Sequence, residues 1–234
     1  MKQTDKELME FLGNKYRPDL GNYWTDIKMR REIALCKTSR DWFVDEAAMY
    51  LYTHIVDSEW RDPYYQFVRE TVPPCDVLDY HGSVGGWGLR LATIGFNPSF
   101  AVTISKSTKF LKWRIQQRGL KCPVYNLDKD DIPVHPLVVC FDRLQQYEPK
   151  TQPGLVKVLA SLGETVIIDL NSKEFSQDGF YYPVDVSGLL GFIHDNYQVI
   201  AEKVSNHYAH LIAFRTGVSA KQTEVENDNS NGSG

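Results

Sequence analysis

Apolar and polar positions follow two different patterns along this chain. Residues 6–12, 24–36 and 41–56 carry apolar side chains at three- and four-residue spacing, which predicts helices. From residue 75 onward, short apolar runs rich in Val and Ile alternate with helical patterns. Such alternation predicts an α/β protein whose mostly parallel sheet is covered by helices on both faces.

The second region gives a definite order of elements. The expected strands cover residues 75–79, 100–104, 123–125, 136–141, 164–170, 197–203 and 207–214, and the expected helices cover residues 87–94, 106–118, 152–162 and 184–194. Two strands follow each other directly at the end, which predicts an antiparallel hairpin there. We therefore expect a seven-stranded sheet that is parallel except for one strand.

Three parts of the chain are expected from these patterns. A helical N-terminal cap covers residues 1–72, an α/β domain covers 73–216, and a polar tail rich in Asn, Ser and Gly covers 217–234. The composition of the tail predicts disorder. The aromatic residues of the cap suit either packing on the sheet or a lid over a substrate, and both interpretations remain open.

Composition and charge argue against several classes of protein. The 234 residues carry a net charge of −4, which is not the basic footprint of a nucleic-acid-binding protein. The N-terminus lacks an apolar signal core, and no apolar run approaches the ~20 residues of a membrane span. Four cysteines without a CxxC pair predict reduced thiols and no zinc ribbon. We expect a cytoplasmic protein with no nucleic-acid partner, no membrane partner and no metal site.

The most informative stretch covers residues 77–88 and reads VLDYHGSVGGWG. An apolar run ends in Asp79, a glycine-rich turn follows, and a helical pattern begins at about Trp87. This order of strand, tight loop and helix is the one with which α/β proteins hold a nucleotide-like ligand.

This stretch resembles the first motif of the class I S-adenosylmethionine-dependent methyltransferases, which is usually Val-Leu-Asp-x-Gly-x-Gly-x-Gly. Further matches follow in the order of that family. Residues 127–133 resemble the motif whose first Asp faces the adenine, residues 137–144 resemble the fourth strand, and residues 163–168 resemble the entry into the fifth. The resemblance implies a Rossmann-like methyltransferase fold with S-adenosylmethionine as its cofactor.

The resemblance also implies a set of cofactor-binding residues. They are Asp79, His81, Gly82, Ser83, Gly85, Thr103, Asp128 and Phe141. Asp79 is expected to order the glycine-rich loop through hydrogen bonds or to touch the ligand. The catalytic base is not identified by the sequence, and His81 and Tyr147 are candidates for a catalytic role.

The chain departs from the family at positions that would contact the cofactor. His81 and Ser83 stand where two glycines are usual, and positive φ angles there would cost about 1 kcal/mol or more. The second strand ends in the run Ala101-Val102-Thr103-Ile104-Ser105-Lys106, without the acid that usually accepts hydrogen bonds from the ribose. Thr103 or Ser105 can make one weaker bond instead.

Two hypotheses of different class follow from this mixture. The first is a methyltransferase that acts on an unknown small-molecule acceptor. The second is a methyltransferase-like protein that has lost its cofactor, and that serves as a scaffold or regulatory partner or uses the site for other chemistry. The expected partner is a small-molecule acceptor or a protein, and a homodimer or a pairing with a related chain would both fit the aromatic-rich N-terminal region.

Overall fold

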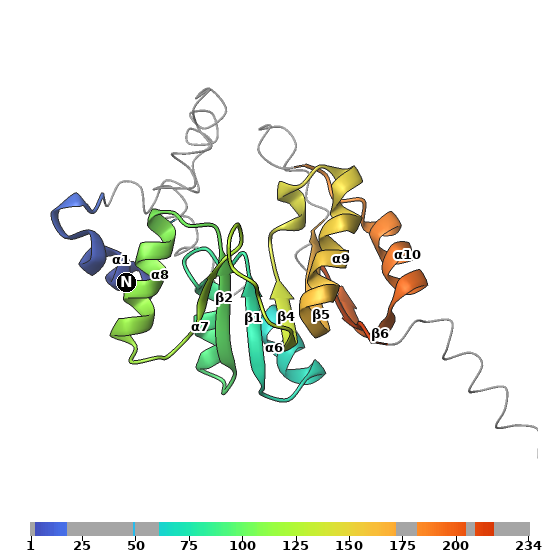
Figure 1. Ribbon diagram of the computed structural model, residues 1–234, viewed down its shortest axis with the longest axis horizontal. Helices are drawn as coiled ribbons and strands as arrows, with labels where there is room; N and C mark the ends of the chain where they lie inside the picture. Colours follow the sequence, from blue (N-terminus) through green and yellow to red (C-terminus); the bar gives the residue numbers. More distant parts are fainter. Residues whose placement is uncertain (1–2, 18–48, 50–60, 172–181, 205–208, 218–234) are drawn as a thin grey trace, which may run out of the picture.

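Figure 1 shows the computed structural model of the chain, which describes residues 3–17, 49, 61–171, 182–204 and 209–217. One seven-stranded sheet forms its centre, in the order β3-β2-β1-β4-β5-β7-β6. The strands are β1 (Asp76–Tyr80), β2 (Asn97–Val102), β3 (Val124–Asn126), β4 (His135–Cys140), β5 (Gly163–Asn171), β6 (Gln198–Val204) and β7 (Ala209–Arg215).

Strand β7 alone runs against the direction of the other strands. It pairs antiparallel with both β5 and β6, whereas the pairs among β1 to β5 are parallel. The predicted seven-stranded sheet with one antiparallel strand is therefore confirmed. The predicted hairpin of β6 and β7 is confirmed as well, and β7 inserts between β5 and β6.

Helices cover both faces of the sheet (Figure 1). They are α1 (Gln3–Leu12), α6 (Asp62–Thr71), α7 (Gly86–Ala92), α8 (Lys106–Gln117), α9 (Gln152–Leu162) and α10 (Val186–Asn196). The apolar sides of α6 and α7 pack on one face of the sheet, and those of α9 and α10 pack on the other. Helix α8 packs beside α7 on β2, and α1 lies on the outer side of α8.

Successive residues of the central strands point to opposite faces, as the strand period of two requires. In β1, Val77 belongs to the core under α6 and α7, and Leu78 belongs to the core under α9 and α10. Both side chains are fully buried. Such two-sided burial explains why the strands read as continuous apolar runs in the sequence.

Strand β2 begins three residues before its expected start at residue 100. Pro98 therefore lies inside the strand, although proline lacks a backbone N–H and is usually confined to edge strands, strand starts or bulges. In the structure β3 pairs only with the last three residues of β2, Phe100 to Val102. The position of Pro98 therefore faces no partner residue of β3.

The N-terminal region is described in part. Helix α1 confirms the first expected helix, and α6 packs directly on the sheet with Tyr64 and Val68 buried. The helices expected over residues 24–36 and 41–56 lie almost wholly outside the described residues, as does the tail after residue 217. Within the described parts of the chain, no helix has the length and apolar character needed to cross a membrane.

Candidate functional site

The loop between β1 and α7 adopts a left-handed backbone at three alternate positions. His81, Ser83 and Gly85 have φ angles of 59°, 44° and 74°. This conformation costs residues with a Cβ about 1 kcal/mol or more, and glycine adopts it freely. The family resemblance places glycines at the positions of His81 and Ser83. The loop therefore keeps a backbone that glycine favours, although two of these positions carry side chains.

Asp79 fixes this loop from the end of β1. Its side chain is buried, and Oδ2 accepts a hydrogen bond of 2.8 Å from the backbone N–H of Gly88 in α7. This contact ties the end of β1 to the first turn of α7. Burial raises the pKa of Asp79 to about 7, while the bond from Gly88 and the charge of Arg143 act in the opposite direction. A Cβ on Gly82 would lie 3.0 Å from the Asp79 carboxyl group, so the loop packs tightly against it.

The two catalytic candidates lie in direct contact. His81 Nε2 and the hydroxyl of Tyr147 form a hydrogen bond of 2.7 Å, although the residues are 66 positions apart. Tyr147 follows the short helix η5 (Leu144–Gln146) beyond the carboxyl end of β4. Burial first, and then the charge of Arg143, lowers the pKa of His81 to about 3. The imidazole is therefore neutral at physiological pH, and its Nε2 can donate or accept a hydrogen bond, depending on the tautomer.

Two residues that the sequence did not single out hold this pair in place. Arg143 Nη2 donates to the backbone carbonyl of His81 at 2.6 Å, and Nη1 donates to the Gln146 side chain at 3.1 Å. Gln152 Nε2 donates to the carbonyl oxygens of Leu144 and Tyr147 at 3.2 and 3.0 Å. Arg143 lies three residues after the end of β4, within the segment 137–144 that resembles the fourth strand of the family, and this resemblance was the available signal for it. No feature of the sequence singled out Gln152, because glutamine is an ordinary residue at the start of a helix.

The remaining predicted cofactor residues occupy two different environments. Thr103 and Asp128 are exposed beyond the carboxyl ends of β2 and β3. Phe141 is 3% exposed, and its ring packs 4.8 Å from Trp87 and 5.2 Å from Tyr64 between ring centroids. The fold thus brings Thr103 and Asp128 to the same edge of the sheet as the loop, whereas the Phe141 side chain lies in the core under α6. The cofactor contacts of all three stay a prediction.

A buried polar cluster lies beside Phe141. Arg61 Nη2 is 2.5 Å from Asp142 Oδ2, and its guanidinium lies 4.8 Å from the ring centroid of Tyr64. Asp169 Oδ1 accepts a bond of 2.7 Å from the Asp142 backbone N–H, and Oδ2 accepts one of 3.2 Å from the Tyr64 hydroxyl. Burial and the neighbouring charge of Asp142 raise the pKa of Asp169 to about 7. The cluster joins the ends of β4 and β5 to the start of α6.

The neutral state of His81 predicts a pH dependence of stability. The folded-state pKa of about 3 lies below the usual 6.5, so below pH 6.5 the unfolded chain binds a proton that the folded chain does not. The stability contributed by His81 is complete above pH 6.5 and declines as the pH falls toward 3. The substitution His81→Asn removes this pH-dependent contribution, and asparagine tolerates the positive φ at the position.

The measurement is urea unfolding of both proteins at pH 7.5 and 5.5. The difference in unfolding free energy between the wild type and His81→Asn should shrink by about 1 kcal/mol at the lower pH. The raised pKa values of Asp79 and Asp169 act on both proteins alike. A difference that stays constant between the two pH values would show that His81 is not held neutral.

Comparison with known proteins identifies the architecture. No protein-family model matches the chain, and no curated protein matches its sequence. Solved structures do match. An O-methyltransferase family protein from Burkholderia thailandensis aligns with a TM-score of 0.60 and 13% identity, over 91% of this chain and 70% of that one. Magnesium protoporphyrin IX methyltransferase from Synechocystis PCC 6803, with bound S-adenosylmethionine, aligns with a TM-score of 0.57 and 14% identity, over 92% and 98%.

A third match points the same way. An S-adenosylmethionine-dependent methyltransferase from Clostridium acetobutylicum aligns with a TM-score of 0.57 and 12% identity, over 74% of this chain and 98% of that one. The fold is that of the class I methyltransferases. In this methyltransferase fold, the loop after β1 and the segment after β4 lie at neighbouring strands, where ligands of open α/β sheets bind. The contact of His81 with Tyr147 lies at that point.

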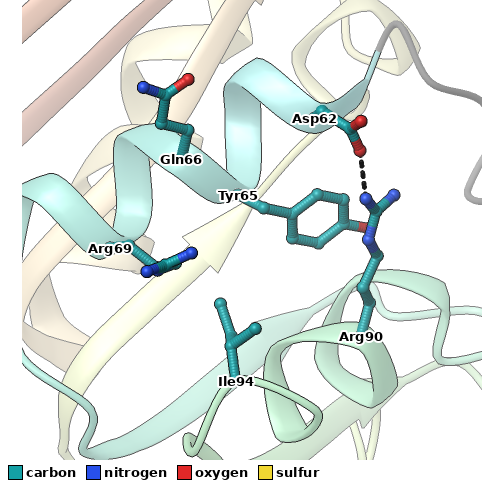
Figure 2. Close-up of a pocket in the computed structure, with 6 residues that line it drawn as sticks. All are labelled: Asp62, Tyr65, Gln66, Arg69, Arg90 and Ile94. Atoms are coloured by element: carbon teal, nitrogen blue, oxygen red, sulfur yellow. Dashed lines mark hydrogen bonds and ion pairs between the residues drawn. The ribbon is translucent and has the colours of Figure 1, made fainter.

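A cavity of about 350 Å³ lies elsewhere on the methyltransferase fold, between α6 and α7. Figure 2 shows Arg90 reaching up from α7 to pair with Asp62 and lying against the ring of Tyr65. Arg69 and Gln66 extend from the next turns of α6, and Ile94 closes the lower side (Figure 2). None of the predicted cofactor residues lines this cavity. Among the residues that the structure describes, no group of three or more His, Cys, Asp or Glu side chains is placed to hold a metal ion.

Proposed function

We propose that this chain is an S-adenosylmethionine-dependent methyltransferase that acts on a small-molecule acceptor. The observation that carries the proposal is the left-handed backbone of the loop at His81, Ser83 and Gly85. A loop that keeps a strained conformation at two non-glycine residues indicates that the conformation itself serves a function. The fold around this loop is shared with a methyltransferase that has S-adenosylmethionine bound.

The side chains present fit this cofactor incompletely. Asp128 is exposed beyond β3, where the resemblance places the residue that faces the adenine. Beyond β2, the hydroxyl of Thr103 or Ser105 would replace the usual carboxylate. Loss of a two-oxygen acceptor for the ribose costs about 1–3 kcal/mol, which corresponds to roughly ten- to hundredfold in affinity. We therefore expect S-adenosylmethionine to bind with weaker affinity than in relatives with the full motif.

The bound cofactor would supply an electrophilic methyl group on a sulfonium. The contribution of the chain is alignment of the acceptor. His81 is neutral and lies in hydrogen-bond contact with the hydroxyl of Tyr147. In the tautomer with an unprotonated Nε2, this nitrogen accepts the hydrogen bond from the Tyr147 hydroxyl. An acceptor hydroxyl that takes the place of the Tyr147 hydroxyl would meet the same nitrogen. Arg143 holds the backbone of His81 during such an exchange.

The test is isothermal calorimetry of the full chain with S-adenosylmethionine and S-adenosylhomocysteine. Wild-type protein should bind both. Asp128→Ala should weaken binding about tenfold, through loss of a hydrogen bond between a charged acceptor and the adenine. Asp131→Ala is the matched control, because Asp131 is also exposed and lies three residues further on, and this variant should bind as the wild type does.

Absence of binding at millimolar ligand would overturn the proposal. A double variant, His81→Gly with Ser83→Gly, then separates the alternatives. If the double variant binds and the wild type does not, the chain is a methyltransferase-like protein whose loop side chains have removed the cofactor. In that case a scaffold or regulatory role with a protein partner replaces the proposed activity.

A further inference from the structure

A chain of buried charged groups connects the N-terminal helix α1 with the glycine-rich loop. Glu7 of α1 is 4% exposed, and Arg114 of α8 is 2% exposed. Glu7 Oε2 accepts a hydrogen bond of 2.8 Å from Arg114 Nε. The same guanidinium uses Nη1 to donate a bond of 2.6 Å to the backbone carbonyl of Val84. Arg114 therefore bridges α1 and the loop directly.

The carbonyl that Arg114 binds lies between two loop positions with a left-handed backbone. Val84 stands between Ser83 and Gly85, both of which have positive φ angles. The direction of the Val84 carbonyl depends on the peptide plane between Val84 and Gly85. A charged donor forms one of the stronger hydrogen bonds to such a carbonyl. The bond from Arg114 thus favours one orientation of this peptide plane, and with it the left-handed φ of Gly85.

Glu7 determines which way the Arg114 guanidinium points. Its carboxylate binds the Nε edge, which leaves Nη1 to face Val84. Arg118 binds the same carboxylate through Nε at 2.9 Å, and no contact of Arg118 with the loop is present among the described residues. Phe11 secures the helix itself, with its ring 5.1 Å from Phe110 between centroids. Helix α1 therefore packs on α8 and places the carboxylate of Glu7 against the buried guanidinium of Arg114.

We infer that Glu7 and Arg114 are positioning residues that hold the glycine-rich loop in its ligand-binding conformation. In this arrangement α1 controls the affinity of the site without touching the ligand. The inference rests on the proposed function in one respect, since the ligand whose affinity changes is the proposed cofactor. The effect on the loop itself is independent of any ligand.

The first experiment is amide hydrogen exchange of the full chain without ligand. Glu7→Gln removes the charge of the carboxylate, and Arg114→Lys keeps a positive charge that cannot reach both partners at once. In both variants the amides of Gly85 and Gly88 should lose about tenfold in protection, while the amides of β5 stay unchanged. These two amides bond to the Gly82 carbonyl and to the Asp79 carboxylate in the structure.

Two control variants test the specificity of the effect. Glu10→Gln changes an exposed carboxylate on the same helix, and Arg118→Gln removes the second partner of Glu7 without touching the loop. Both controls should leave the amides of Gly85 and Gly88 as protected as in the wild type. Unchanged protection in Glu7→Gln and Arg114→Lys, or an equal loss throughout the sheet, would overturn the inference.

A double variant keeps the test valid if the single variants do not fold. Glu7→Leu with Arg114→Met replaces a buried ion pair by apolar side chains, which is often neutral for stability. The double variant should retain wild-type thermal stability and still lose the protection of Gly85. A double variant with full stability and full protection of Gly85 would contradict the positioning role.

The second experiment measures affinity for S-adenosylhomocysteine by calorimetry. Glu7→Gln and Arg114→Lys should bind it about tenfold more weakly, and the two control variants should bind as the wild type does. Equal affinity of all variants would overturn the inference. If the wild type binds no S-adenosylhomocysteine, the proposed function fails, and the exchange experiment alone then decides whether α1 positions the loop.

Discussion

Gly85→Ala is expected to destabilise the chain by about 3 kcal/mol, the sum of a backbone and a packing penalty. The residue has a φ of 74°, which disfavours any side chain. An added Cβ would also overlap Cδ1 of Leu111 and lie 3.2 Å from Cδ1 of Leu89, both in the core. Thermal unfolding should show a Tm lower by roughly 6–12 °C for a chain of this length.

The matched control separates these two causes. Gly119 also has a positive φ, 64°, but a Cβ there would meet no atom within 4 Å. Gly119→Ala should therefore lose only about 1 kcal/mol, the backbone penalty alone. Similar losses in Gly85→Ala and Gly119→Ala would show that the loop is not packed against Leu111 as described. Calorimetry should also find that Gly85→Ala binds no S-adenosylmethionine.

Asp142→Asn is expected to cost about 3 kcal/mol, because it removes the charge that faces a buried guanidinium. Arg61 is 2% exposed, and its Nη2 lies 2.5 Å from the Asp142 carboxylate. Asn is the suitable replacement, since Asp142 has a φ of 58° and Asn tolerates that conformation well. The loss therefore reports on the charge and not on the backbone. Urea unfolding should give the difference in unfolding free energy directly.

The control for this prediction is an ion pair at the surface. Glu148 and Lys150 lie 2.7 Å apart with side chains 48% and 79% exposed. Glu148→Gln should change the stability by less than about 0.5 kcal/mol, because solvent screens exposed pairs. A loss in Asp142→Asn as small as that of the control would mean that solvent reaches Arg61 in solution.

These two variants differ in what they do to the site. Gly85→Ala changes the loop that the proposed cofactor would contact. Asp142→Asn acts one strand away, at the cluster under α6 that joins β4 and β5. Neighbouring Arg143 carries the hydrogen bond to the His81 backbone, so a shift of the segment after Asp142 would reach His81. We therefore expect Asp142→Asn to weaken the binding of S-adenosylmethionine only if the substitution also displaces Arg143.

The sequence determined those features of this protein that depend on local periodicity and on motif order. The alternation of apolar runs and helical patterns predicted the α/β sheet and its single antiparallel strand. The glycine-rich stretch predicted the loop between β1 and α7. Its substitutions pointed to His81 and Ser83 as residues under backbone strain. The features of the loop are encoded within residues 77–88, whereas the sheet follows from the order of elements along the whole α/β region.

The tertiary structure alone decided which distant groups meet. The contact of His81 with Tyr147 spans 66 positions, and that of Arg114 with Glu7 spans 107. Such contacts follow from the sheet order and from how helices dock, and they leave no periodic signal in the sequence. Burial also follows from the tertiary structure, because it depends on which elements cover a side chain. Burial in turn shifts the pKa values of the Asp79 carboxylate and the His81 imidazole, and so decides whether these groups are charged. For this reason the sequence predicted the fold and the position of the site, and only the folded chain shows how α1, α8 and the segment after β4 hold that site together.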